Sequence, residues 1–383
     1  MKPLEGLLVL DFSQFLAGPY AALRLADLGA DAVKIENPNG GDICRHMYIS
    51  NLDIDGDSSL FQAINRNKSS IALDLKAPEA RGTLEALIKK ADVMLMNFRP
   101  GVAARLGLDY DTVHALNPTL VYGDITGYGK EGPWVKRPGQ DLLVQSVSGM
   151  AWLNGDAQQP PMPVGLSIVD MMAGEHLIQG VLSALVRRGV SGEGAYVEVN
   201  MLESALDIQF EGFTAFLNDG HELPVRSSVN NANPYIAAPY GIYETADGYL
   251  ALAMVPIPRL GELLECQPLL AYTDSADWSG KRDEIKGILV EHLKTRRTGD
   301  WLSVLEAADI WCADVLDWNR LMECEGFQAL DMVQTVRRAN GTALETLRCP
   351  IRIDGEVYKS EKAAPKLDEH DPAWLQNLLE AAQ

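Results

Sequence analysis

The first third of the chain alternates between short apolar runs and amphipathic stretches, and this alternation constrains the fold more than any other feature. The apolar run GLLVLDF (6–12) predicts a strand, AGPYAALRLADLG (17–29) predicts a helix, and DAVKIE (31–36) predicts a second strand. The alternation continues with predicted strands at 69–76, 91–98 and 119–129 and predicted helices at 77–90 and 110–118. Such alternation is typical of βαβ units, so we expect an α/β fold with a Rossmann-like, mostly parallel sheet.

Beyond this region the pattern changes. A long amphipathic helix is predicted at about 171–189, and residues 218–235 are polar and rich in turn formers, as is typical of a linker. A hairpin at 240–254 with Asp-Gly at its turn, followed by several helices, predicts a smaller α+β unit. The stretch LRCPIRIDGEV (347–357) predicts a strand that returns towards the first domain.

The chain is strongly acidic, with 53 Asp and Glu residues, 33 Lys and Arg residues and a formal net charge of −20. This excess of negative charge repels nucleic acid and anionic lipid, so neither is expected as a partner. An anionic ligand would need a local basic pocket. The N-terminus lacks the basic region of a signal peptide and no apolar stretch is long enough to span a membrane, so we expect a cytoplasmic protein.

Neither the cysteines nor the histidines have the spacing of metal ligands. The five cysteines include no C-x-x-C pair, and the six histidines form no H-E-x-x-H motif. We therefore expect reduced thiols and no metal site. The chain also lacks the G-x-S-x-G motif of serine hydrolases, so hydrolysis by a metal ion, a serine or a cysteine is weakly supported.

Two segments partly match dinucleotide-binding motifs. GYGKEG (127–132) has G-x-G-x-x-G spacing after a predicted strand, but Pro133 and Pro138 disfavour the helix that this motif requires. The N-terminal strand–helix–strand ends at Glu36, where a ribose-binding acid would lie, yet its turn contains only Gly18. Redox chemistry with a nicotinamide or flavin is therefore weakly supported. The sheet can still be Rossmann-like, because a fold does not determine a function.

A single carboxylate, Asp170, lies at the start of the long predicted helix, in PVGLSIVDMMAG (163–174). Taken alone, this position favours a capping role, because Asp accepts hydrogen bonds from the first N–H groups of a helix and its charge suits the helix dipole. The rest of the chain adds a second interpretation.

Five segments of the chain occur in a recognisable order. They are NRNKSSIALDLK (65–76), ADVMLMNFRPGVAARLGL (91–108), NPTLVYGDITGYGKEGP (117–133), PGQDLLVQSVSG (138–149) and PVGLSIVDMMAG (163–174). In this order they resemble family III of the CoA-transferases, which includes formyl-CoA:oxalate and carnitine CoA-transferases and the related α-methylacyl-CoA racemases. The resemblance extends from LEGLLVLDF to CPIRIDG, nearly the whole chain.

The resemblance implies that Asp170 is a covalent nucleophile. Direct attack of a free carboxylate on a thioester is slow, and a protein carboxylate divides the transfer into easier steps through an acyl–aspartyl anhydride and an aspartyl–CoA thioester. We expect the helix N-terminus to keep Asp170 ionised. The implied reaction moves CoA from an acyl-CoA donor to a small carboxylic acid, with the CoA thioester as substrate and no permanently bound cofactor.

The resemblance also implies where CoA binds. The basic residues on the matching segments are Lys76, Arg99 and Arg105, of which Arg105 matches a CoA contact of the family best. Asn97 and Phe98 resemble residues near the adenine and ribose of CoA. An Arg is otherwise typical of a solvated surface, and both interpretations of Arg105 stay open.

Gln140 and Asp141 match positions near the nucleophile. The racemases have a histidine where Gln140 stands, and glutamine cannot act as the base that exchanges an α-proton. Gln14 and Leu16 flank the position where formyl-CoA transferase has a glutamine facing the acyl group, and Leu16 matches that position. The glycine-rich loop of that enzyme has no counterpart in NNANPYIAAPYG (230–241), so the case for oxalate is weakened.

The family implies a large CoA-binding domain formed by residues 1–224, to which the segment 326–383 returns, a small α+β domain at 225–325, and an interlocked homodimer. Two alternatives stay open. One is a racemase or other isomerase of CoA esters, against which Gln140 argues, and the other is a CoA-binding protein without turnover, against which Asp170 argues.

Overall fold

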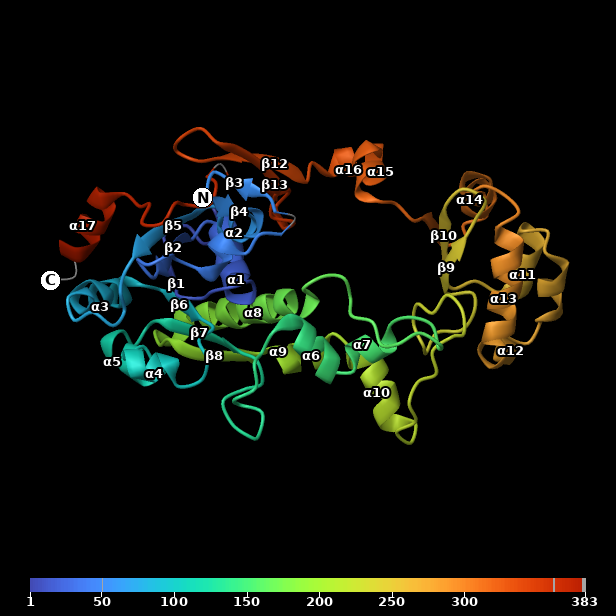
Figure 1. Ribbon diagram of the computed structural model, residues 1–383, viewed down its shortest axis with the longest axis horizontal. Coiled ribbons are helices and arrows are strands. Elements are labelled where there is room, and N and C mark those ends of the chain that lie inside the picture. Colours follow the sequence, from blue (N-terminus) through green and yellow to red (C-terminus); the bar gives the residue numbers. More distant parts are fainter. Residues whose placement is uncertain (50, 361, 381–383) are drawn as a thin grey trace. The chain divides into compact units, whose positions relative to one another are not determined.

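The computed structural model describes residues 1–49, 51–360 and 362–380 (Figure 1). The chain divides into two compact units, which are Met1–Val144, Ser167–Ile208 and Ala329–Gln383 in the first and Gln145–Leu166 and Gln209–Gln328 in the second. Each unit has its own sheet and its own buried core.

A six-stranded parallel sheet forms the centre of the first unit. Its strands are β1 (Leu8–Asp11), β2 (Asp31–Glu36), β5 (Lys68–Ala72), β6 (Val93–Met96), β7 (Val121–Thr126) and β8 (Ala195–Asn200), in the spatial order β5-β2-β1-β6-β7-β8. Counted within this sheet alone, the order is 3-2-1-4-5-6, the order of Rossmann-type sheets. The prediction of an α/β fold with a mostly parallel, Rossmann-like sheet is confirmed.

Helices cover both faces of this sheet (Figure 1). α1 (Ala17–Asp27) and α8 (Ile168–Ser191) pack on one face and against each other, while α3 (Ala80–Lys90) and α5 (Tyr110–Leu116) pack with Leu8, Leu10 and Phe12 on the other. Gly174 permits the close approach of α8 to α1, because a Cβ there would lie 2.8 Å from the carbonyl oxygen of Ala17. The start of α8 is therefore held beside the start of α1.

The C-terminal residues of the first unit pack on the edge of the sheet formed by β5. Backbone N–H groups of Asn67 and Ser70 donate to the carbonyl oxygens of Lys362 and Glu369, and α17 (Pro372–Glu380) packs on α3. The segment thus returns to the N-terminal sheet.

The stretch 347–357 does not form the single strand that was predicted. β12 (Val333–Arg337) pairs with β13 (Ala343–Leu347), and β14 (Arg352–Ile353) pairs with β15 (Glu356–Val357), each in an antiparallel hairpin. The turn of the second hairpin is Asp354-Gly355, with φ of 51° and 82°. Two successive positive φ values are typical of a tight hairpin turn, so the chain folds back within this stretch.

The second unit contains β9 (Gly241–Glu244), β10 (Tyr249–Leu252) and β11 (Cys312–Asp314) in an antiparallel sheet. The predicted hairpin is β9–β10, and β11 is a short third strand that the sequence did not reveal. Helices α11 (Ile257–Leu263), α13 (Arg282–Leu293) and α14 (Thr298–Ala307) pack around fully buried Trp301.

The remaining elements are η1 (Ile43–His46), β3 (Asp53–Ile54), β4 (Asp57–Ser58), α2 (Ser59–Asn65), α4 (Val102–Leu106), α6 (Asp141–Val147), α7 (Met150–Leu153), α9 (Met201–Asp207), α10 (Phe210–Asn218), η2 (Gln267–Ala271), α12 (Ser275–Gly280), α15 (Trp318–Glu323) and α16 (Glu325–Leu330). Within the described residues, no helix combines the length and the apolar character needed to cross a membrane.

Candidate active site

The switch point of the sheet lies between β1 and β6, from which the chain continues to opposite sides. The side chain of Asn97, directly after β6, joins the two loops that leave these strands. Its Oδ1 accepts a hydrogen bond from the backbone N–H of Gln14 at 2.9 Å, and its Nδ2 donates to the carbonyl oxygen of Gln14 at 2.6 Å. Ligands of sheets with this topology bind outside the carboxyl ends of the strands at the switch point.

A cavity of about 660 Å³ opens at this position, and all of its lining residues belong to the first unit. Its apolar lining includes Phe15, Leu16, Cys44, Met47, Tyr48, Ile49 and Leu60. Its polar lining includes Asn97, Arg99, Thr126, Arg137, Gln140, Ser167 and Asp170. Of the described residues that line the cavity, Asp170 is the one that carries a carboxylate.

Asp170 is the third residue of α8, and its side chain is partly exposed to the cavity. Burial and then the negative charge of Asp141 raise the pKa of Asp170 from 3.8 to about 7. The prediction that the helix N-terminus keeps Asp170 ionised was therefore wrong, because desolvation and a second carboxylate outweigh the helix dipole. The carboxyl group therefore holds its proton to a higher pH than an ordinary aspartic acid.

The capping role predicted for Asp170 belongs to Asp141. Asp141 is the buried first residue of α6, and its Oδ2 accepts hydrogen bonds from the backbone N–H groups of Val169 at 2.8 Å and Asp170 at 3.1 Å. Ser167, the residue before α8, makes no side-chain capping bond. A carboxylate from a neighbouring helix thus takes the orphan N–H groups that the first turn of α8 leaves.

Two glycines bring α6 to this position. Gly127 follows β7 and Gly139 precedes α6, and their backbones are in direct contact, because a Cβ on Gly127 would lie 2.6 Å from the Cα of Gly139. The first glycine belongs to the G-x-G-x-x-G match, whose following helix is absent: the next described helix is α6, which begins only at Asp141. The motif therefore serves a backbone crossing, not a phosphate site.

A buried network of charges supports the wall of the cavity. Lys34 donates from Nζ to the carbonyl oxygen of Ser13 at 2.7 Å and pairs with Asp42 at 2.8 Å. Asp42 in turn accepts hydrogen bonds from the backbone N–H groups of Cys44 at 2.9 Å and Phe15 at 3.4 Å. These bonds hold Phe15 at a φ of 64°, a strained conformation for an aromatic residue, with its ring at the cavity.

Deeper in the same network, Asp11 pairs with Lys68 at 2.8 Å. Burial alone would raise the pKa of Asp11, but Lys34 and Lys68 lower it to about 2. Burial lowers the pKa of Lys68 to about 8. All three groups are fully buried and mutually paired, so they position the loop after β1 and do not face a ligand.

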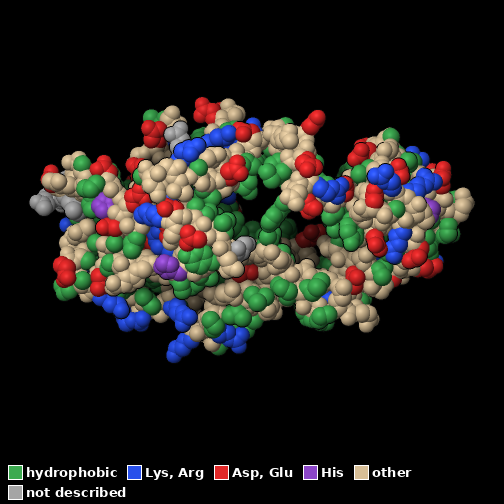
Figure 2. Space-filling view, turned by 45° about the horizontal axis from the view of Figure 1, so that its top comes forward, with side chains coloured by type: hydrophobic (Ala, Val, Ile, Leu, Met, Phe, Trp, Pro, Cys, Tyr) green, Lys and Arg blue, Asp and Glu red, His purple; other side chains and the backbone are tan. Residues whose placement is uncertain are grey.

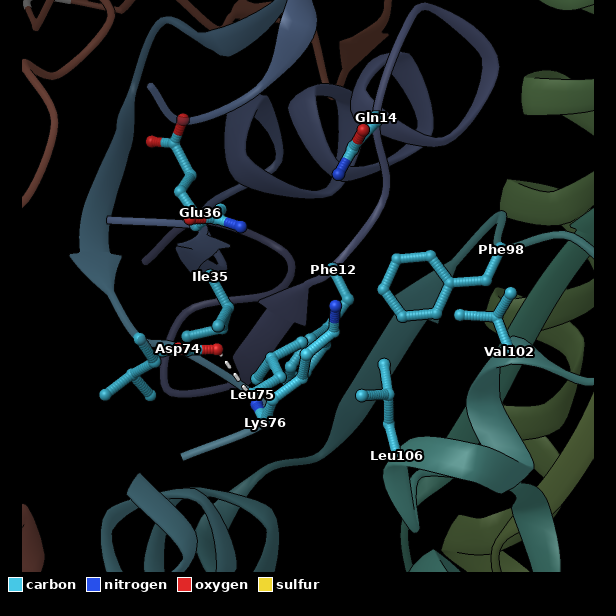
Figure 3. A pocket seen from close by; sticks show the side chains of 12 residues that line it. Phe12, Gln14, Ile35, Glu36, Asp74, Leu75, Lys76, Phe98, Val102 and Leu106 are labelled. Atoms are coloured by element: carbon cyan, nitrogen blue, oxygen red, sulfur yellow. Dashed lines mark hydrogen bonds between the residues drawn. The ribbon is translucent and has the colours of Figure 1, made fainter. Parts of the chain in front are cut away.

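A second, smaller cavity of about 170 Å³ lies beside the first, and Phe98 lines both (Figure 3). The sticks in Figure 3 show Phe98 facing Phe12 and the α4 residues Val102 and Leu106. Lys76 lies at the opposite side, where its backbone N–H donates to Asp74 at 3.0 Å. The smaller cavity thus combines an apolar wall with a polar one, which consists of Gln14, Glu36, Asn37, Asp74 and Lys76.

The predicted site residues are distributed over these two cavities. The larger cavity is lined by Asp170 and by Leu16, Asn97, Arg99 and Gln140. The smaller cavity is lined by Gln14 and Lys76, and Phe98 lines both. Arg105 is exposed at the last turn of α4 and is not among the described lining residues of either cavity. Asp141 is not among the described lining residues of either cavity; it contacts the backbone at Asp170 and raises the pKa of its carboxyl group.

Glu36 is not available to a ribose, although it borders the smaller cavity. Its Oε1 pairs with Arg45 at 2.7 Å and accepts a hydrogen bond from Ser70 at 2.6 Å, and its Oε2 accepts the backbone N–H of Asp42 at 2.9 Å. The carboxylate is buried and fully used within the protein.

Positive charge is local in an otherwise acidic protein. In Figure 2, Lys and Arg side chains (blue) gather along the lower edge of the unit that holds the sheet and in a second group near its upper edge, whereas Asp and Glu side chains (red) are dispersed over the face. Among the described residues, neither Arg99 nor Arg137 has an acidic partner within ion-pair distance, so both cations at the larger cavity are available to an anionic ligand. The described residues contain no group of three His, Cys, Asp or Glu that could hold a metal ion.

Residues 4–371 match CoA-transferase family III. The chain belongs to this family. It is 31% identical over 387 residues to the succinate–glutarate CoA-transferase of Agrobacterium fabrum, covering 98% of this chain and 96% of that protein. It is 32% identical to the acetyl-CoA:oxalate CoA-transferase of Acetobacter aceti, over 97% and 94% of the two chains. The family resemblance and the assignment as an enzyme of the CoA-transferase class are confirmed.

Solved structures agree with the fold of this CoA-transferase. A CaiB/BaiF family protein from Brucella suis superposes with a TM-score of 0.84 at 28% identity, over 98% of this chain and 99% of that one. A protein from Mycobacterium tuberculosis gives a TM-score of 0.83 at 29% identity, over 97% and 98% of the chains.

Several residues of the larger cavity were not predicted from the sequence. Arg137 directly precedes the matching segment 138–149, so extending that segment by one residue would have found it. Cys44 and Tyr48 lie in a segment with no motif, and no sequence signal marks them. The capping role of Asp141 depends on a contact between residues 29 positions apart and is equally invisible in sequence.

Proposed function

We propose that this CoA-transferase is a cytoplasmic enzyme that moves CoA from an acyl-CoA donor to a small dicarboxylic acid, with Asp170 as the covalent nucleophile. The observation that carries the proposal is the position of Asp170. It lines a cavity of about 660 Å³ together with Arg99 and Arg137, neither of which has an acidic partner within ion-pair distance among the described residues, and its pKa is raised to about 7. A strongly perturbed carboxyl group in a concave site is typical of a catalytic residue.

The proposed transfer balances in four steps. The Asp170 carboxylate attacks the thioester carbonyl, which releases the CoA thiolate and leaves an acyl–aspartyl anhydride. The thiolate then attacks the Asp170 carbonyl, which releases the donor acid and leaves an aspartyl–CoA thioester. The acceptor carboxylate attacks this thioester, and the released thiolate attacks the acceptor carbonyl, which regenerates Asp170 and yields the new acyl-CoA.

We place the adenine end of CoA in the smaller cavity and its thioester in the larger one. The shared wall at Phe98 and the apolar lining of Phe12 and Leu106 suit a flat aromatic base. Lys76 and Arg99 border the two cavities and suit the phosphates of CoA. Both cavities lie within the segment 1–224 that we propose as the main part of the CoA-binding domain.

A dicarboxylic substrate is supported by charge. One carboxylate of such an acid reacts at Asp170, and the other needs a cation, because burying an unpaired charge is costly. Arg137 lines the same cavity, with its guanidinium 4.6 Å from the Trp134 ring. The names of similar CoA-transferases include succinate, glutarate, oxalate and mesaconate, which are all dicarboxylic acids.

The homodimer implied by the family is also part of the proposal. α10 buries none of its residues although it carries Phe210, Phe213 and Leu217, all of them exposed. An apolar helix without a partner is typical of an interface, and a second copy of this chain is the proposed occupant. Phe213→Glu is expected to shift the molar mass in light scattering from dimer to monomer, whereas Thr214→Glu, at a neighbouring exposed position, should not.

The decisive experiment follows oxygen atoms. With an acceptor acid labelled by ¹⁸O in both carboxylate oxygens, one label should remain in the acyl-CoA product and the other should enter the carboxyl group of Asp170. Mass spectrometry of the peptide that contains Asp170 detects this label after one turnover, and the peptide with exposed Asp111 is the control. Label found in the released donor acid after a single turnover, with none in Asp170, would show direct transfer and reject the covalent mechanism.

A further inference from the structure

We infer that Asp141 is a positioning residue that fixes Asp170 and sets the reactivity of its carboxylate. The inference rests on the proposed role of Asp170 as nucleophile. It goes further because it attributes the position and the basicity of the Asp170 carboxylate to a second carboxylate, on α6.

The geometry of the helix start carries the inference. The first N–H groups of a helix have no partner within the helix and would ordinarily stabilise a nearby carboxylate. Here the N–H groups of Val169 and Asp170 donate to Oδ2 of Asp141, at 2.8 and 3.1 Å. The donors that could have stabilised the anion of Asp170 are thus used by another anion.

Asp141 is itself held firmly. It is buried, it begins α6, and the carbonyl oxygen of Gln140 before it accepts the N–H of Val144 at 3.0 Å. The contact between Gly127 and Gly139 fixes the chain that leads into it. A carboxylate placed in this way acts on Asp170 with constant geometry and with little screening by water.

Two consequences follow for the chemistry. The negative charge of Asp141 raises the pKa of Asp170, second only to burial. A more basic carboxylate is a stronger nucleophile, but a smaller fraction of it is ionised at neutral pH. Asp141 thus increases the reactivity of each ionised Asp170, and it does so without contact with substrate.

Other titratable groups lie in the cavity, along α8 and on the helices α1 and α9 that pack on α8. Cys44, Tyr48, Arg99 and Arg137 line the cavity, and burial raises the pKa of Cys44 to about 12, so that this thiol stays neutral. On the flanking helices, Tyr20 of α1 donates to Glu175 at 2.5 Å, and His176 lies 3.1 Å from Asp207 of α9. Arg24 pairs with Asp27 at 3.0 Å.

Two variants separate the charge of Asp141 from its capping bonds. Asp141→Asn keeps a side-chain oxygen that can accept the same N–H groups but removes the charge, since Asn is as good a helix cap as Asp. Asp141→Ala removes both. A purely structural role predicts that the Asn variant behaves like the wild type.

The readouts are the pH dependence of kcat, the KM for acyl-CoA, the Tm, and an NMR titration of the ¹³C-labelled Asp170 carboxyl group. We expect Asp141→Asn to lower the acid-limb midpoint of kcat and the NMR pKa of Asp170 by about one pH unit. The limiting kcat at high pH should fall several-fold, with KM and Tm nearly unchanged. Asp141→Ala should also lower the Tm.

The outcomes distinguish this inference from the proposed function. An unchanged pKa of Asp170 and an unchanged limiting kcat in Asp141→Asn would overturn the inference while leaving the nucleophile assignment intact. CoA transfer by the Asp170→Ala variant at a rate near that of the wild type would instead overturn the proposed function. The NMR titration needs no substrate, so it decides on the role of Asp141 in either case.

Discussion

Gly127 and Gly139 are in backbone contact, and this contact joins the end of β7 to the start of α6. A side chain on either glycine meets the backbone of the other, since the Cβ of residue 127 would lie 2.6 Å from the Cα of Gly139. The loop between them supplies Val135, Arg137 and Pro138 to the larger cavity, which Asp170 also lines. Both glycines are therefore structural requirements of the site.

Gly139→Ala is expected to disturb the site more than its size suggests. The added methyl group forces the two backbone segments apart, which typically costs about 1–3 kcal/mol in a packed region. The displacement moves Gln140 and Asp141, so kcat should fall at least about tenfold. Thermal unfolding and steady-state kinetics measure the two effects.

Gly189→Ala is the matched control. This glycine lies in the last part of α8, and a Cβ there would meet nothing within 4 Å. Alanine in a helix is more stable than glycine by roughly 0.5–1 kcal/mol, so the Tm should rise slightly with no change in kcat. Equal activity of both alanine variants would contradict the structural role of the glycine contact.

The stability of the protein should depend on pH through Asp170. Its folded-state pKa of about 7 lies above its usual value of 3.8, so the stability that depends on this group is fully present below pH 4. That contribution is lost as the pH rises to about 7, because the unfolded state ionises first. Asp170→Asn cannot ionise, so it should raise the Tm, more at pH 8 than at pH 5.

Differential scanning calorimetry at a series of pH values measures this effect. The gain should reach its maximum near pH 7 and stay constant above it. Asp111→Asn is the control, since Asp111 is an exposed acid in the first turn of α5. That variant should lower the Tm slightly and equally at pH 5 and pH 8, because it removes a favourable charge from a helix N-terminus. A Tm of Asp170→Asn equal to that of the wild type at pH 8 would contradict the raised pKa.

The fold was predictable because its signals are local. Strands β1 and β6 are short apolar runs, and helices α1, α3 and α5 each have their own periodicity, so these elements follow from short windows of sequence. Because strands that alternate with helices usually pair in parallel within one sheet, the α/β fold could be predicted from these elements. The shorter elements η1, β3, β4, α2 and α4 were not predicted. The short strand β11 escaped prediction because its three residues depend on pairing with β10.

The site was predictable in part, for the same reason. Asp170 lies in a segment with a family pattern, and so do Phe98 and Gln140. The buried charges that support the cavity wall come in part from distant positions, since Asp11 pairs with Lys68. No local pattern specifies which buried acid meets which base, so this network could only be found in three dimensions.

Racemisation of CoA esters is expected to be negligible. Gln140 lines the cavity of Asp170 at the position where the racemases of the family have a histidine, and an amide cannot accept the α-proton. Incubation of a 2-methylacyl-CoA with the enzyme in deuterated water should leave the α-hydrogen unexchanged by mass spectrometry. Incorporation of deuterium at a rate comparable to CoA transfer would favour the isomerase alternative.

Arg105 and Arg99 should differ in their effect on CoA binding. Both side chains are exposed, but Arg99 lines the cavity that contains Asp170, whereas Arg105 lies on α4 and is not among the described lining residues of either cavity. A charge-assisted bond to a phosphate is worth roughly 1.5–3 kcal/mol, and less where water screens it. A ligand in the cavity would exclude water from Arg99 more than from Arg105, so Arg105→Ala is expected to raise the KM for acyl-CoA by about tenfold at most, and Arg99→Ala by more.

In both variants kcat should change little, because a contact with the distant phosphates is the same in the ground state and the transition state. Lys90→Ala, an exposed cation in the last turn of α3, controls for the loss of one positive charge from a protein of net charge −20. Added salt screens the repulsion between this acidic surface and CoA, so each KM is measured at matched ionic strength. A fall in kcat with an unchanged KM in Arg105→Ala would exclude this residue as a phosphate ligand and leave Arg99 and Lys76 as the candidates.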